Sequence, residues 1–441
     1  MTTTALSPTE FLRLPPVTRA DLEEVVARRG GEPQWLRGSR AAAWEAYESQ
    51  AMPDPKDDEW RRTELSGIDL GALRPAGRYQ GQLPSHLHWA GKGDFAGQVA
   101  QIDGASDAAW LDEQLRAQGV ALFDLDSAAA RQDLEGLLYA SVYTDWKLVS
   151  LNSALWQGGC FLYVPDGVEV ALPLHYWQAI ATGGVSVFPR TLIRLGANSR
   201  ARFVHEVASE EDTEALVSGA VEVYLGANAR LEYYSINRWG HRVNYFNTIR
   251  ASLEPGAEAT IVNAGLGGDL TKAKTEVLLR GEGSAANLLD VSLGDGRQRF
   301  DYVTLQDHLA PRTTSDLLYK AALTGRASEV WYGTVRIHGG ATGSDANQTS
   351  RNLLLSSTAK AAPIPVLEIE QFDILRCSHG ATAGPVDEEQ LFYLESRGIE
   401  HDEAERMLVD AFFQEVLDRI PDESLRERVQ GALAAKLEAS R

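Results

Sequence analysis

A repeat of about thirty residues in the middle of the chain constrains the fold most strongly. Residues 195–203 read L-G-A-N-S-R-A-R-F and residues 225–233 read L-G-A-N-A-R-L-E-Y, so the two segments are offset by thirty positions. Residues 253–261 and 280–288 follow with a similar form at slightly shorter offsets. Each copy has the pattern of a strand, a turn built from Gly, Ala or Asn, and a second strand. We therefore expect residues 161–373 to be β throughout.

Short strands at a regular spacing are compatible with three architectures: a sandwich, a propeller and a parallel β-helix. The small residues at the turns favour the β-helix, because its corners stack directly on one another and leave little room for side chains. The repeat by itself leaves all three architectures open.

The segments on either side of the repeat have different patterns. Before it, helical patterns around Leu22 and Val25 and over residues 40–50, 108–115 and 127–143 predict an N-terminal helical or mixed domain, residues 1–150. The β core is then predicted over residues 151–384. A C-terminal helical domain, residues 385–441, is predicted from Asp387, a capping residue for a short helix over 388–397, and from a broad apolar stripe over 403–420.

Charge and cysteine content exclude several classes of protein. The 441 residues include 62 acidic and 42 basic side chains, a net charge of −20, which argues against binding to nucleic acid or anionic membranes. No stretch approaches the roughly 20 apolar residues of a membrane span, and the first residues do not resemble a secretion signal. The two cysteines, Cys160 and Cys377, exclude a disulfide framework and indicate a reducing compartment. We expect a cytoplasmic protein.

Cys377 and His379 form the only Cys and His pair that is close in sequence. On a strand, residues two apart point to the same side and lie roughly 6–7 Å apart, and thiolate and imidazole both bind iron. The spacing is equally compatible with a core cysteine beside a histidine at a strand end. An iron-sulfur cluster usually takes about four protein ligands, so a chain with two cysteines would have to share a cluster with another subunit. We interpret Cys160 as structural.

Longer motifs surround this pair. The end of an asparagine-rich strand at 352–355 is followed by P-V-L-E-I at 365–369, C-S-H-G-A-T at 377–382 and L-F-Y-L-E-S-R-G-I at 391–399. This block resembles the SufB/SufD family of iron-sulfur cluster assembly proteins, and weaker matches at 55–63 and 163–168 extend the resemblance over most of the chain. The resemblance implies a mainly β fold with a right-handed parallel β-helix core.

Two departures from the pattern point to one branch of the family. SufB-type members carry a cysteine near the position of Ala359 and a His-Glu pair where this chain has His379 and Gly380. The missing cysteine makes the chain most like SufD, the partner of the principal scaffold. The family's matching histidine is implicated in cluster assembly between the two paralogues, so the resemblance implies that His379 is a metal ligand. Cys377 is a weaker candidate, because free cysteine is often a small buried hydrophobe.

The resemblance implies a SufD-type scaffold subunit of the SUF complex. Its expected partners are a SufB-type paralogue, with which it shares a transient iron-sulfur cluster, and a SufC-type ABC ATPase bound to the C-terminal helices. No Walker loop G-x-x-x-x-G-K-[ST] occurs in the sequence, so we expect a non-catalytic subunit whose partner hydrolyses ATP. Iron delivery and binding of a reduced flavin by the complex are further expectations from the resemblance.

Three alternatives remain open at this point. A β-helix enzyme acting on carbohydrate would need a pair of carboxylates in one groove, with Glu206, Glu222 and Glu232 as candidates. A homodimer that acts without the paralogue would use the same exposed sheet edge. The helix over 403–420 is also compatible with a cap on the open end of the β-helix.

Overall fold

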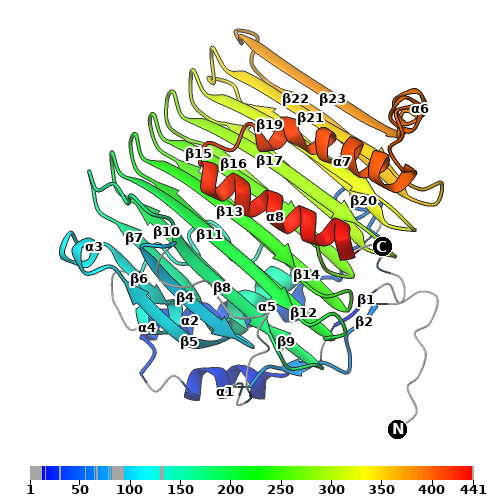
Figure 1. Cartoon of the computed structure of the whole chain (residues 1–441). Coiled ribbons are helices and arrows are strands. Elements are labelled where there is room, and N and C mark those ends of the chain that lie inside the picture. Colours follow the sequence, from blue (N-terminus) through cyan, green and yellow to red (C-terminus); the bar gives the residue numbers. More distant parts are fainter. Residues whose placement is uncertain are drawn as a thin grey trace.

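The chain folds into a parallel β-solenoid of about 8 turns with helices on both sides (Figure 1). The computed structural model describes residues 12–439, except 15, 29–30, 55, 64, 66–67, 78, 80, 82–93 and 130–133. The predicted fold class, a mainly β solenoid between helical N-terminal and C-terminal regions, is confirmed. The predicted domain boundaries after residues 150 and 384 stay a prediction.

Successive strands of the solenoid alternate between two sheets. Sheet 1 contains β3 (Arg74–Pro75), β6 (Ala121–Asp124), β7 (Gly159–Val164), β9 (Val185–Val187), β10 (Arg190–Leu195), β12 (Ala215–Leu225), β14 (Val243–Leu253), β16 (Leu270–Leu279), β18 (Arg299–His308), β20 (Ser328–Ile337) and β22 (Lys360–Ile369). Sheet 2 contains β4 (Gly97–Ile102), β5 (Ala105–Leu111), β8 (Leu174–Ile180), β11 (Arg200–Ser209), β13 (Arg230–Arg238), β15 (Glu258–Gly265), β17 (Ala285–Gly294), β19 (Thr314–Leu323), β21 (Asp345–Leu354) and β23 (Arg376–Pro385). A separate short pair joins β1 (Leu12–Arg13) to β2 (Ile68–Asp69). Two strands therefore make one turn of the solenoid.

The sequence repeat corresponds to this turn. Arg200 pairs in parallel with Arg230, Arg230 with Glu258, and Glu258 with Ala285, so each copy of the repeat lies on the previous one. The corner before these strands holds one residue with a left-handed backbone in each turn, such as Asn198 with φ of 57° and Asn228 with φ of 56°. Asn and Gly tolerate this conformation better than other residues do. The amide of Asn198 donates to the carbonyl of Ala227 in the next turn, which explains the periodic Asn and Gly.

The interior of the solenoid lies between the two sheets and is mostly apolar. Alternate residues of each strand point inward and form one core cluster that runs from Val99 to Ala359, with Phe203, Tyr233 and Trp331 among its large members. The outer faces of the sheets are also covered, which is why most strands between β7 and β21 are buried on both sides. Strands buried on both faces read as nearly continuous apolar runs.

The N-terminal helices cover sheet 1. The helices α1 (Arg19–Arg28), α2 (Gln34–Ser49) and α5 (Lys147–Leu155) pack with Phe188, Leu216 and Phe246 of the sheet into one apolar cluster. The strands β4 and β6, which lie in the predicted N-terminal domain, extend the two solenoid sheets by pairing with β8 and β7. The N-terminal region is therefore continuous with the solenoid in its hydrogen bonding.

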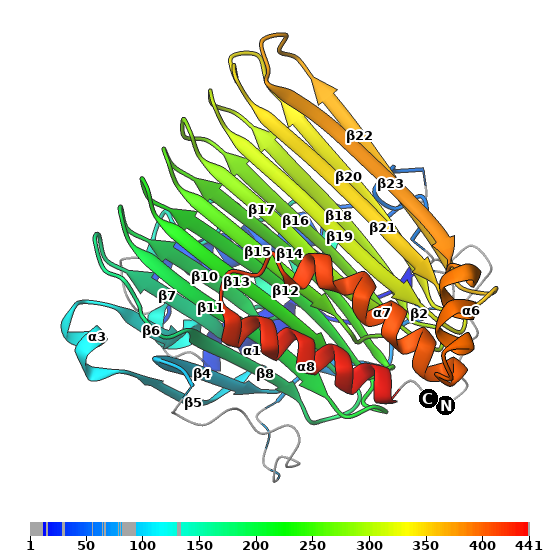
Figure 2. The same ribbon diagram turned by 45° about the horizontal axis from the view of Figure 1, so that its top comes forward.

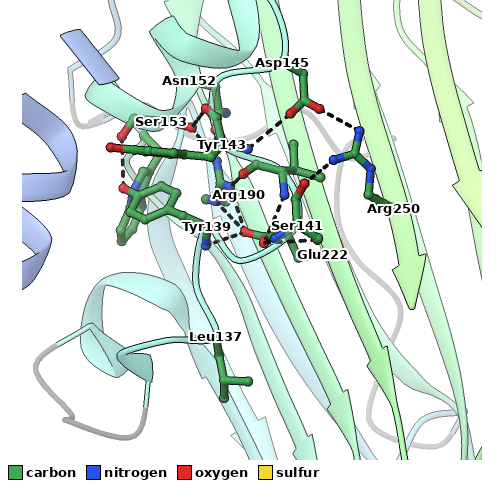
Figure 3. A network of polar contacts seen from close by, with 12 residues as sticks. Leu137, Tyr139, Ser141, Tyr143, Asp145, Asn152, Ser153, Arg190, Glu222 and Arg250 are labelled. Atoms are coloured by element: carbon green, nitrogen blue, oxygen red, sulfur yellow. Dashed lines mark hydrogen bonds and ion pairs between the residues drawn. The ribbon is translucent and has the colours of Figure 1, made fainter. Parts of the chain in front are cut away.

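A buried ion pair joins the N-terminal region to sheet 1. The guanidinium of Arg190 on β10 lies 2.7 Å from the carboxylate of Glu222 on β12, and both side chains are inaccessible to solvent. Glu222 also accepts hydrogen bonds from the backbone amides of Tyr139, Ser141 and Val142 (Figure 3). One carboxylate therefore fixes the loop before α5 to two neighbouring strands.

Two helices predicted in the N-terminal region are wrong. Residues 105–111 form the strand β5, which pairs antiparallel with β4, and only α3 (Glu113–Ala117) follows as a helix. After α4 (Leu125–Ala128), the described residues up to 146 form short turns. The reason is tertiary, since an edge strand takes up residues 105–111 and Glu222 binds amides that a helix would use internally.

The C-terminal helices confirm one prediction and correct another. Asp387 caps α6 (Glu388–Ser396) by accepting from the amides of Glu389 and Gln390, as expected. The helices α7 (His401–Leu417) and α8 (Glu423–Ala439), the latter not predicted, lie across the outer face of sheet 2 (Figures 1 and 2). Their apolar residues pack on that face, with Phe413 and Val429 fully enclosed. The apolar stripe of α7 therefore covers the side of the solenoid and does not cap its open end.

Polar contacts hold these helices on sheet 2. On α7, the carbonyl of Phe412 accepts from the buried ammonium of Lys320 at 2.7 Å. On α8, Arg428 donates to Glu206 of β11 at 3.0 Å. Burial opposes ionisation of Glu206, but hydrogen bonds from His175 and Arg428 outweigh it and lower its pKa to about 2. The carboxylate is therefore charged at neutral pH and binds α8 to the sheet.

We predict that Glu222→Ala destabilises the protein by about 3–5 kcal/mol, because it leaves the buried Arg190 without its counter-charge. Chemical denaturation monitored by circular dichroism measures this change. The control is Glu258→Ala, which removes an ion pair with Arg230 whose side chains are about half exposed and is expected to cost no more than about 1 kcal/mol. Equal costs for the two variants would contradict the role given to Glu222.

The end of α8 provides a pH-dependent prediction. His241 lies 2.7 Å from Glu211 and 2.9 Å from Asp295, and Lys436 of α8 lies 3.0 Å from Asp295. The hydrogen bond with Asp295 raises the pKa of His241 above its usual 6.5, against the opposing effects of burial and Lys436. A histidine whose pKa is higher in the folded chain contributes stability that is complete below the unfolded pKa and disappears as the pH rises through the folded value.

We therefore expect wild-type protein to melt at a higher temperature than His241→Gln below pH 6.5. This difference should shrink as the pH rises above that value. Thermal melts of both proteins over a series of pH values measure the effect. A difference that is constant with pH would show that protonation of His241 does not contribute.

Candidate functional site at the open end of the solenoid

The last turn of the solenoid has exposed strand edges. Among the described strands, β22 pairs only with β20 in sheet 1, and β23 pairs only with β21 in sheet 2. Most residues of these two strands are partly or fully exposed, in contrast to the buried strands before them. Unpaired strand edges are sites at which another chain can add a strand.

Large apolar side chains are exposed beside these edges. Phe372 is completely exposed and Leu375 is 77% exposed, both in the connection between β22 and β23, while Ile369 at the end of β22 is 44% exposed. On α6, which lies near the end of β23 (Figure 2), Phe392 is 69% and Tyr393 56% exposed. Apolar side chains gathered at one end of a protein are typical of a protein interaction surface.

His379 lies on β23, within this exposed turn. It pairs in register with Gln348 of β21, which is completely buried, whereas His379 itself is exposed. Its neighbour Ser378 donates to Asn347 at 2.8 Å, so the residues on either side of Ser378 point to the opposite face of the sheet. His379 makes no hydrogen bond to any described residue. The imidazole is therefore accessible to a second protein at the open end.

Cys377 also lies on β23, two residues before His379, as expected from the strand pattern. It is half-buried and packs against a small apolar cluster that includes Val335, Ile337 and Ala346. Burial raises the pKa of the thiol, which disfavours the thiolate that metals bind. The two candidates therefore lie on one strand in different surroundings: His379 is accessible, whereas Cys377 is partly enclosed. Their role as metal ligands stays a prediction.

The remaining cysteine of the solenoid is buried, and several of its histidines form hydrogen bonds with neighbouring side chains. Cys160 is completely buried on β7. His175 bonds to Glu206, His205 to Tyr233, and His338 to Asp307. His86 and His88 lie outside the described residues. Ala359, where SufB-type members carry cysteine, is buried directly before β22 and has no group that binds metal.

The described part of the chain lacks two features that bear on the function. No three side chains of the types His, Cys, Asp and Glu come together there in a geometry that holds a metal ion. No helix in the same residues has the length and apolar character required to cross a bilayer. A cluster bound at His379 would thus need ligands from a second molecule or from outside the described residues.

The three carboxylates considered for a carbohydrate-active site do not form a pair. Glu222 lies on sheet 1 in its ion pair with Arg190, whereas Glu206 and Glu232 lie on sheet 2. Glu206 is level with Ile236, four residues beyond Glu232, a separation of roughly 13 Å along the strands. Glycosidases need their two carboxylates within about 5–9.5 Å. Glu232 also accepts a hydrogen bond from Tyr234, so each of the three has a structural partner.

The sequence predicts that Cys377 and His379 share one face of a strand, but it does not predict the exposed surface around them. Phe372, Leu375 and Ile369 are exposed because no further described strand pairs with the outer edges of β22 and β23. One feature of the sequence could have indicated this surface. The β pattern ends with its last copy and a helical pattern begins after it, which marks the last turn of the solenoid.

Comparison with known proteins agrees with this geometry. Residues 178–412, more than half of the chain, match the family described as "SUF system FeS cluster assembly, SufBD core domain". The chain is 29% identical over 423 residues to the iron-sulfur cluster assembly protein SufB of Bacillus subtilis, covering 91% of this chain and 90% of the relative. It is 28% identical over 418 residues to an iron-sulfur cluster assembly SufBD family protein of Staphylococcus epidermidis, with 90% and 88% coverage.

The matched region includes nearly all of the solenoid, the exposed last turn and most of α7. The resemblance noted in the sequence leads to the same family. The chain therefore belongs to the SufBD family of the SUF system for iron-sulfur cluster assembly.

Proposed function

We propose that this chain is a SufD-type scaffold subunit of a cytoplasmic SUF complex. In this proposal it pairs with a SufB-type paralogue at the open end of its solenoid and binds a SufC-type ATPase through its C-terminal helices. The chain itself is not catalytic, and the nascent iron-sulfur cluster is the cargo of the complex. The observation that carries the proposal is an accessible histidine, His379, on an unpaired strand at an apolar end of the protein.

The composition of the open end supports a protein partner. Two unpaired strand edges and the exposed Phe372 and Leu375 would remain in water in an isolated chain. A related solenoid with a similar last turn would satisfy the backbone groups of both edges and bury these side chains. A second copy of this chain could form the same contact, so the homodimer remains the main alternative.

The number of ligands supports a shared cluster. An iron-sulfur cluster needs about four protein ligands, and this end of the described chain offers His379 and the half-buried Cys377. The other ligands would come from the partner across the interface. The SufD assignment rests on Ala359 and Gly380, since overall similarity to a protein named SufB does not separate the two branches.

The contacts of the C-terminal helices support coupling to an ATPase. Lys320 and Arg351, on β19 and β21, both pair with Glu415 of α7, at 2.6 and 3.0 Å. The strand β23 follows β21 directly in sheet 2. ATP-driven closure of the partner would pull on α6 and α7, and these contacts would transmit the movement to the strand that carries His379.

The first experiment is co-expression of the tagged chain with SufB-type and SufC-type proteins, with native mass spectrometry and anaerobic absorption spectroscopy of the purified product. The expected result is a stoichiometric complex with cluster absorbance that the chain alone does not show. A dimer of this chain that captures neither protein would overturn the proposal.

We predict that His379→Ala leaves folding and complex formation unchanged and lowers the amount of bound cluster. Loss of one metal ligand is expected to weaken cluster binding by about tenfold or more. The measurement is iron and sulfide content per complex, together with the absorption spectrum. The matched control is Ser378→Ala, on the same strand but facing the opposite side. A normal cluster content in His379→Ala would exclude the ligand role.

A further inference from the structure

A pocket of about 490 Å³ lies at the corner where the later strands of sheet 1 begin. Its lining includes the first residues of β16, β18, β20 and β22, together with Arg62 and Thr63 of the N-terminal region. The segment before Thr63 is held on the sheet, because Lys272 on β16 donates to the carbonyl of Glu59 at 2.7 Å. The pocket is thus formed between two parts of the chain that lie far apart in sequence and are hydrogen-bonded to each other.

The walls of the pocket combine apolar surface with two cations. Phe300, Val330 and Leu354 are among its apolar lining residues. Arg62 and Lys360 also line it, and both are exposed. Neither forms an ion pair with any described residue, although 62 acidic side chains give the chain a net charge of −20. Two cations that form no ion pair among the described residues, beside one pocket, are unexpected in such an acidic protein and favour an anionic ligand.

The other charges that line the pocket are already compensated. Asp301 accepts from Lys272 at 2.8 Å and also from the hydroxyl of Thr63, while Arg299 donates to Asp269 at 2.6 Å. These contacts leave the positive charges of Arg62 and Lys360 as the ones available to a ligand.

Glu329 is a second and independent sign of a ligand. It lines the pocket, it is only 3% exposed, and its Oε2 atom has no hydrogen-bond partner among the described residues. Burial, reinforced by the nearby Asp290, raises the pKa of this carboxyl well above its usual range. The protonated form, which this shift favours, can donate a hydrogen bond and does not repel an anion. Buried polar atoms without partners are uncommon in folded proteins.

From these observations we infer that the pocket binds a small organic anion. Its carboxylate or phosphate group lies between Arg62 and Lys360, and its apolar body rests on Val330 and Ala362, which lie in register on the outer face of sheet 1. The volume is within the range of about 300–1,000 Å³ that is typical of small-molecule sites. This site is separate from His379 and does not depend on the proposed role in cluster assembly.

The test is ligand binding to the purified full-length chain, measured by calorimetry and saturation-transfer NMR. The probes are phenyl phosphate, benzoate and inorganic phosphate. We expect saturable binding of at least one of the two aromatic anions and weaker binding of inorganic phosphate. Removing both cations in Arg62→Gln/Lys360→Gln should weaken this binding by at least about tenfold. Arg280→Gln, which removes an exposed cation outside the pocket, should leave it unchanged.

A second variant tests the apolar part of the pocket. Ala362→Leu adds side-chain volume at a lining residue and should weaken binding of the same aromatic anion. Thermal melts check that this variant is folded. Three outcomes would overturn the inference. These are no saturable binding of either aromatic anion, binding that neither pocket variant changes, and inorganic phosphate binding as tightly as phenyl phosphate.

Discussion

Parallel hydrogen bonding between successive turns is the constraint on which the rest of this structure depends. Each strand of the solenoid takes its register from the strand one turn earlier, as Arg230 does from Arg200. The corner residue must adopt a left-handed backbone so that its amide reaches the next turn, as the amide of Asn198 reaches Ala227. Because every turn satisfies the one before it, the last turn is left with backbone groups that no other described strand satisfies. The open end therefore follows directly from the way in which the solenoid is built.

The helices on the two sides of the solenoid cover apolar surface that the stacking of turns leaves exposed. Both outer faces of the solenoid are apolar and would be exposed without α1, α2 and α5 on sheet 1 and α7 and α8 on sheet 2. Their attachment combines apolar packing with a few buried charges, such as the pair of Arg190 and Glu222. A buried pair adds little net stability, but it penalises any arrangement in which one partner is left alone. These contacts therefore select one position for each helix.

The two features that we relate to function lie in different parts of the last turns. His379 is at the unpaired edge of sheet 2, where a partner would add ligands, and the pocket near Lys360 is at the opposite end of the sheet 1 strands, where they begin. The first site would be completed by a second chain, whereas the second is formed within one chain by the N-terminal segment. A protein interface and a small-molecule site can therefore coexist on this fold.

The sequence by itself determined the repeat, the shared face of Cys377 and His379, and the capped helix α6, because these depend on local patterns and on backbone conformations that few residues accept. The alternation over residues 365–377 predicted one strand, whereas the structure has β22 and β23 with a connection over 370–375. The asparagines of the corners and Asp387 are examples in which one residue type reveals a local structure. Tertiary structure decided the conformation of residues 105–111, because pairing with β4 outweighs their helical pattern. It also decided that α7 lies on the side of the solenoid and that α8 joins it, because only the folded chain shows which apolar face is uncovered. The exposure of His379 beside the enclosed Cys377 was likewise decided by the folded chain, since a period of two places both on one face but does not show where the stack of turns ends.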